Sequence, residues 1–232
     1  SAASDVYKRQ IIYTEVMFSK EISGELPEHT RFIYETAIPY FEKHGIHTRV
    51  LHAEKTYLDC FYHVVSRGNA QGKLAAFPLA GRCAIQRDCK VPPLEAYKES
   101  LPPGTVSYLG IAADEPIRLE RLKPDQVSLM AKYGVTEQDA FAMCRQEGLL
   151  SPLYEHSHRG GCWFCPNASM TELRHLYRAH PDLWQLMLEL QDTPNKATER
   201  FNQNFKFAEL DLRFRLEGEQ LSFYDQELEV ER

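Results

Sequence analysis

The sequence predicts an α/β protein with a parallel sheet followed by a C-terminal helical extension. A β-branched and aromatic segment at residues 11–18 begins a strand–helix–strand pattern, and a crossover helix between two strands makes them a parallel pair. The alternating pattern then gives way to a helical end. We divide the chain into three parts. Residues 1–10 are a non-native scar or a disordered segment, residues 11–150 an α/β domain, and residues 151–232 a cysteine-bearing loop with the helical extension.

The first elements follow one another closely along the chain. Residues 11–18 predict a buried strand, and apolar residues at helical spacing predict a helix over 27–44. Pro39 should bend or interrupt this helix, since proline lacks the N–H that an inner turn needs. Gly45 ends the helix, and residues 48–53 predict the second strand.

The middle of the chain carries weaker signals. Thr56 is placed to cap a helix that runs to about Val65, and Pro92 opens another helical segment. Residues 105–112 read Thr-Val-Ser-Tyr-Leu-Gly-Ile-Ala and predict a third strand.

The second half is predicted to be helical. Thr136 with Asp139 resembles a capping box, and Ser169 begins a second one, because in each pair two side chains can satisfy two free N–H groups at a helix start. Pro181 begins a further helix, and an amphipathic helix is expected near residues 207–216.

Composition and charge exclude several classes of protein. The net charge is −6, of which six acids and one base at residues 217–232 contribute −5, so residues 1–216 are nearly neutral. A general nucleic-acid surface of the strongly basic kind is therefore not indicated, and the acidic tail predicts a solvated terminus. No apolar stretch is long enough for a membrane span and no secretory leader opens the chain, so we expect a soluble, cytoplasmic protein without a membrane partner.

Cysteine spacing predicts a metal site. Two pairs of thiols supply its four ligands: Cys83, Cys89, Cys162 and Cys165. The segment 160–166 reads Gly-Gly-Cys-Trp-Phe-Cys-Pro, and two thiolates at this spacing can grip one metal in a tight turn. Four sulfur ligands suit a zinc ion or an iron–sulfur cluster. The remaining Cys60 and Cys144 lie at apolar helical positions, where we expect them in the core.

Other interpretations of the same residues stay open. The cysteines can be reduced, partly buried thiols without a ligand, or Cys162 and Cys165 can form a redox dithiol. His156 or His158 can replace one cysteine as a ligand, although histidines in such a loop more often face solvent or substrate.

A second constellation follows the third predicted strand. Residues 110–116 read Gly-Ile-Ala-Ala-Asp-Glu-Pro, and Arg118 and Arg121 come directly after. Ligands of open parallel sheets bind beyond the carboxyl ends of the strands, where such groups orient a ribose, a metal ion or a phosphate. Glu15, at the end of the first strand, is similarly placed. The alternative is a helix cap with surface arginines.

At these residues the chain resembles the phosphoadenosine phosphosulfate (PAPS) reductase-like branch of the PP-loop ATP pyrophosphatase superfamily. Four pieces carry the resemblance in the family's order and span most of residues 11–216: residues 13–29, 110–118, 127–140 and 151–166. The last piece, with its Gly-Cys-Trp-Phe-Cys-Pro run, is the most specific. The resemblance implies a Rossmann-like (adenine nucleotide alpha hydrolase-like) sheet and an enzyme that uses ATP or another adenine nucleotide for adenylation or sulfur transfer.

The resemblance also implies roles for the residues singled out above. Five side chains would line the nucleotide: Glu15, Asp114, Glu115, Arg118 and Arg121. The four paired cysteines would hold the iron–sulfur cluster or zinc ion. The small-molecule nucleotide is the expected partner, and no catalytic base or acceptor substrate can be named.

Departures from the family pattern qualify the prediction. The family's phosphate loop, Ser-Gly-Gly-x-Asp-Ser, and the strand before it do not occur in these residues, so we expect a sheet that lacks its first strand and an inactive fragment. Ala112 stands where the family has a loop arginine, and Pro116 where serine is usual. The alternatives are a degenerate nucleotide-binding module with structural zinc, or a thiol redox protein.

Overall fold

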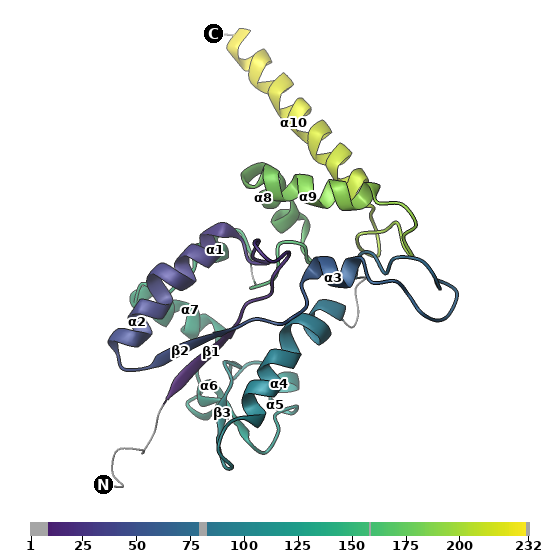
Figure 1. Cartoon of the computed structure of the whole chain (residues 1–232). Helices are drawn as coiled ribbons and strands as arrows, with labels where there is room; N and C mark the ends of the chain where they lie inside the picture. The colour runs from purple at the N-terminus through teal and green to yellow at the C-terminus, as the bar shows by residue number, and fades with distance from the viewer. Residues whose placement is uncertain (1–8, 79–82, 158, 231–232) are drawn as a thin grey trace.

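The computed structural model describes residues 9–78, 83–157 and 159–230, with side chains described as far as residue 218 (Figure 1). The described part is a mixed α/β structure with short parallel sheets, which confirms the coarse fold class. It holds two separate pairs of parallel strands rather than one continuous sheet. His158 and most of the residues assigned to the scar lie outside the described residues.

The first sheet is the predicted strand–helix–strand unit. β1 (Gln10–Thr14) pairs in parallel with β2 (His47–Leu51), in a register that sets Gln10 opposite His47. Gln10 also accepts a hydrogen bond from the hydroxyl of Tyr97 at 2.6 Å. Gln10 is thus part of β1, and the assignment of residues 1–10 to a scar stays a prediction.

The crossover between these strands is interrupted near Pro39, as predicted. It consists of α1 (Pro27–Phe32), a π-helical turn (Ile33–Ala37) and α2 (Ile38–Lys43). Because the nitrogen of Pro39 cannot donate the hydrogen bond of a regular turn, the ladder of α-helical bonds is interrupted there. Gly45 follows with a φ of +72°, a left-handed conformation in which glycine is unstrained.

The second sheet is shorter than the sequence predicts. β3 (Ser107–Tyr108) pairs in parallel with β4 (Gln126–Val127), so most of the expected strand 105–112 is loop. Helix α4 (Val91–Glu99), after a π-helical turn at Gln86–Lys90, precedes β3. Two short helices flank β4: α5 (Pro116–Leu119) and α6 (Leu129–Lys132).

The predicted helix starts are confirmed by reciprocal capping boxes. Thr56, Thr136 and Ser169 each accept a bond from a backbone N–H three residues on, and the acidic side chain there accepts from the cap's own N–H. These residues begin α3 (Tyr57–Phe61), α7 (Glu137–Gln146) and α8 (Met170–Ala179). Helix α3 ends at Phe61, before the predicted end near Val65.

The C-terminal part is helical, as expected. A short 3₁₀ turn (Pro152–Glu155) precedes α8, and α9 (Pro181–Asp192) follows it. Helix α10 (Phe207–Val230) continues well past the predicted end at residue 216 and extends away from the body in Figure 1. None of the described helices combines the length and apolar character that a membrane crossing needs.

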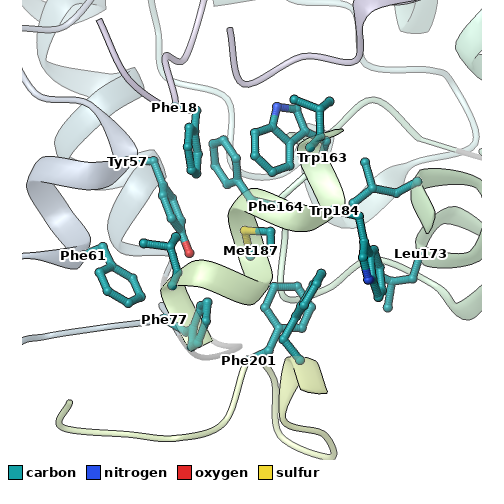
Figure 2. Close-up of a cluster of buried hydrophobic side chains, with 14 of the residues drawn as sticks. Phe18, Tyr57, Phe61, Phe77, Trp163, Phe164, Leu173, Trp184, Met187 and Phe201 are labelled. Atoms are coloured by element: carbon teal, nitrogen blue, oxygen red, sulfur yellow. The ribbon is translucent and has the colours of Figure 1, made fainter. Parts of the chain in front are cut away.

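One aromatic core joins the two halves of the chain. Figure 2 shows Phe18 and Tyr57, from the first half, beside Trp163 and Phe164 of the cysteine-bearing segment. The ring centroids of Tyr57 and Phe164 are 4.2 Å apart, and those of Phe18 and Trp163 are 4.7 Å apart. Met187 from α9 lies in the same cluster. The cysteine-bearing segment is thus packed against the strand half, while the division into two domains stays a prediction.

Candidate functional site

A cavity of about 450 Å³ is lined both by the loop after β3 and by the residues just before the cysteine turn. Its walls come from the loop after β3, from α7 and from the turn before the cysteines, and six side chains define its character: Glu115, Arg118, Glu137, Phe141, Tyr154 and Arg159. The volume lies within the range of small-molecule sites. We call this cavity the loop cavity and use these six side chains to define its lining.

Backbone contacts fix the loop that forms one wall of this cavity. The Ser128 hydroxyl donates to the carbonyl of Ile111 at 2.5 Å, and the Ala113 N–H donates to the carbonyl of Val135 at 2.9 Å. The Ala112 N–H donates to the Glu115 carboxylate at 3.0 Å. The loop is therefore held by its neighbours on both sides and presents a defined surface to the cavity.

The charged residues of this loop have different roles. Asp114 accepts a hydrogen bond from the Glu137 N–H at 3.1 Å, so its carboxylate caps α7. Glu115 pairs with Arg118 at 2.5 Å, and this hydrogen bond, with that from the Ala112 N–H, lowers the pKa of Glu115. Arg118 lines the loop cavity with its side chain 58% exposed, whereas Arg121 is not among the lining residues.

The rest of the lining includes an aromatic pair and a second arginine. Phe141 and Tyr154 meet edge to face, with ring centroids 5.0 Å apart. The Arg159 guanidinium donates to the Cys165 sulfur at 3.5 Å. Two arginines beside an aromatic pair can hold a planar aromatic group and an anion in one molecule.

Glu15 lies elsewhere and is a buried hydrogen-bonding centre. Its side chain is 6% exposed, and its carboxylate accepts bonds from Ser23 at 2.6 Å, Tyr34 at 2.7 Å and His52 at 2.9 Å. Burial raises the pKa of Glu15, but these three hydrogen bonds outweigh burial and hold the pKa below its ordinary value. The carboxylate thus stabilises the turn after β1.

The lowered pKa of Glu15 predicts a loss of stability in acid. Because the folded-state pKa lies below the ordinary value of 4.5, the stabilisation is present above that value and is lost as the pH falls through the folded-state pKa. Glu15→Gln should cost about 1–3 kcal/mol at pH 7 and flatten the fall in unfolding free energy below about pH 5. Urea unfolding between pH 7 and pH 3 tests this, with exposed Glu54→Gln as the control. Equal pH profiles for the two variants would contradict the assignment.

The cysteine turn is anchored by its aromatic residues. The Trp163 N–H donates to the Gly24 carbonyl at 2.9 Å, and the indole N–H donates to the Ser23 carbonyl at 2.9 Å. The Cys165 N–H donates to the Cys162 carbonyl at 3.0 Å, which closes the turn. Burial, followed by the charge of Glu25, raises the pKa of Cys162.

The sulfur atoms of the four predicted ligand cysteines do not gather within 4.8 Å of one another, and their role as metal ligands stays a prediction. Among the described residues, one group of ligand-type side chains has all its donor atoms within 4.8 Å of one another, and it contains no cysteine. The 4.8 Å limit describes ligands of one zinc ion. It does not apply to an iron–sulfur cluster, because its thiolates bind different iron atoms. All six cysteines are free thiols.

Cys60 contacts Cys89, one of the predicted ligand cysteines. The sequence did not indicate this contact. The sulfur of Cys60 lies 3.6 Å from that of buried Cys89, and this contact lowers the pKa of Cys60 and raises that of Cys89. Tyr57 lies among these thiols: burial, followed by the charges of Cys60, Cys162 and Cys83, raises its pKa. Because Cys60 and Cys89 are 29 positions apart in the sequence, no local spacing could have revealed the pair.

A group of histidines and a glutamate lies outside the loop cavity. It consists of Glu28, His175 and His180, none of which the sequence singled out as a ligand. His156, the predicted substitute ligand, stacks on His175 with ring centroids 4.0 Å apart.

Comparison of the chain with protein-family models, with curated proteins and with solved structures finds no match.

Proposed function

We propose that this chain binds an adenine nucleotide in the loop cavity, as part of a PAPS reductase-like PP-loop protein that when intact carries out ATP-dependent adenylation or sulfur transfer. The observation that carries the proposal is the pairing of Arg118 and Arg159 with the Phe141–Tyr154 aromatic pair around one cavity. A nucleotide has the matching parts, a planar base for the aromatic wall and phosphates for the arginines.

The position of the cavity in the fold supports the same proposal. The loop of residues 110–116 follows β3, a strand of a parallel pair, and parallel sheets bind their ligands beyond the carboxyl ends of the strands. The two parallel pairs are also compatible with parts of one Rossmann-like sheet. The resemblance to PAPS reductase-like proteins supplies the choice of an adenine nucleotide.

Isothermal titration calorimetry with ATP and with AMP tests the proposal. Arg118→Ala should weaken binding by about tenfold or more, because it removes a charge-assisted hydrogen bond and leaves the Glu115 carboxylate facing the phosphates. Arg121→Ala is the matched control, an arginine three residues away that does not line the loop cavity. Equal affinities for the two variants, or no binding to the wild-type chain, would reject the assignment of this cavity.

A binding module without turnover is the second candidate function. The carboxylates of Glu15 and Asp114 are engaged by donors of the protein itself, which favours structural roles for them over catalysis. The 232 residues also contain no Ser-Gly-Gly-x-Asp-Ser sequence. Release of pyrophosphate from ATP by the chain would favour the enzyme, whereas ATP binding without release would favour the module.

A further inference from the structure

Three side chains from two distant parts of the sequence converge in the fold. Glu28 lies in the first turn of α1, His175 lies in α8, and His180 lies between α8 and α9. His175 is 147 residues from Glu28 in sequence. The side chains are 26%, 19% and 14% exposed, in the order given, so solvent still reaches them.

The distances among these groups match those of ligands on one metal ion. The Nε2 atom of His175 lies 3.2 Å from one carboxylate oxygen of Glu28, and the Nε2 atom of His180 lies 3.1 Å from the other. All the donor atoms lie within 4.8 Å of one another. Bonds of about 2.0–2.1 Å from zinc to nitrogen or oxygen set tetrahedral ligand atoms about 3.3 Å apart.

Packing restricts the orientation of both histidine ligands. The His156 ring stacks on His175 with an interplanar angle of 17°, which restricts the orientation of the ligand ring. His180 joins two packed helices, so its backbone is fixed by both.

We propose that Glu28, His175 and His180 form a binding site for a divalent transition metal ion, with zinc as the best match to the ligands. Two imidazoles and one carboxylate are a ligand set of zinc sites that keep a fourth coordination position for solvent or substrate. The site shares no residue with the loop cavity or the predicted cysteine ligands, so it stands independently of the proposed nucleotide function.

The alternative is a purely structural triad, in which both imidazoles donate hydrogen bonds to Glu28. The two interpretations differ in what His180→Gln should do. Glutamine keeps an N–H donor for Glu28 but replaces the imidazole, a far better ligand for zinc. A structural triad predicts unchanged metal binding in this variant, whereas a metal site predicts its loss.

The experiment is a titration of the full chain with Zn²⁺ and with Co²⁺ as single probes. Zn²⁺ affinity at this site should fall by at least about tenfold in His175→Gln, His180→Gln and Glu28→Gln, since even substitutions in the outer shell of metal sites cost that much. Bound Co²⁺ should give visible d–d bands without sulfur charge transfer, which separates this site from the cysteines. His47→Gln is the matched control, a surface histidine paired with Glu42 at 2.9 Å.

Unchanged Zn²⁺ affinity in the three folded variants would overturn the proposal. Co²⁺ spectra of the wild-type chain that show sulfur ligation alone would overturn it as well. If the variants do not fold, crystals of the wild-type chain grown with Zn²⁺ decide the matter by anomalous scattering. A zinc peak between Glu28, His175 and His180 is the expected result, and a map without that peak rejects the site.

Discussion

Replacing Trp163 with alanine should lower the free energy of unfolding by about 3–5 kcal/mol, the usual cost of deleting a buried aromatic side chain. Trp163 is 5% exposed, and its ring lies 4.7 Å from Phe18 and 5.0 Å from Phe164, centroid to centroid. Its indole N–H also donates to the Ser23 carbonyl, so the substitution removes a hydrogen bond together with the packing.

Guanidinium unfolding followed by circular dichroism measures this effect. Tyr133→Ala is the control, because Tyr133 is 71% exposed and should change stability by no more than about 0.5 kcal/mol. Trp163→Ala should also weaken nucleotide binding, since the same segment carries Arg159 into the loop cavity. Equal stability of the two variants would mean that the cysteine segment is not packed on the core.

Gly24→Ala is the second substitution with a large expected effect. An added Cβ would lie 2.5 Å from the Val16 carbonyl oxygen and 3.0 Å from a ring carbon of Phe164. The Gly24 N–H donates to the same Val16 oxygen at 2.7 Å, so the backbone cannot move away without losing that bond. We expect a loss of about 1–3 kcal/mol, the typical cost of overpacking.

The matched control for this substitution is Gly110→Ala. A Cβ at Gly110 meets nothing within 4 Å, so its effect on unfolding should be small. Thermal and denaturant melts of both variants provide the comparison. A Gly24→Ala protein as stable as Gly110→Ala would show that the turn after β1 has more room than the described contacts allow.

Features with local causes were predictable from the sequence. The capping boxes at Thr136 and Ser169 need residues three apart, and both form as predicted. The interruption near Pro39 follows from the missing proline N–H. Strand β4 was missed because two residues at Gln126–Val127 carry too little pattern to separate a strand from a loop.

Features that depend on the fold could not be read in advance. The sequence places Glu15 at the end of a strand, where it was predicted to face a ligand. Only the fold brings Tyr34 and His52 close enough to donate hydrogen bonds to its carboxylate. The Glu28–His175 contact spans 147 residues, so no spacing rule detects it. Helix α10 continues into the acidic tail, where the apolar spacing that indicated its first part no longer holds.

In the proposed complex, an adenine base lies against the Phe141–Tyr154 pair, with the phosphates toward Arg118 and Arg159. The most direct test is photolabelling of the wild-type chain with an azido derivative of ATP, followed by mass spectrometry of the labelled peptides. Binding in the loop cavity should place label on α7 and on the 3₁₀ turn at Pro152–Glu155, and unmodified ATP should displace it. Label confined to other segments, or label that ATP does not displace, would contradict it.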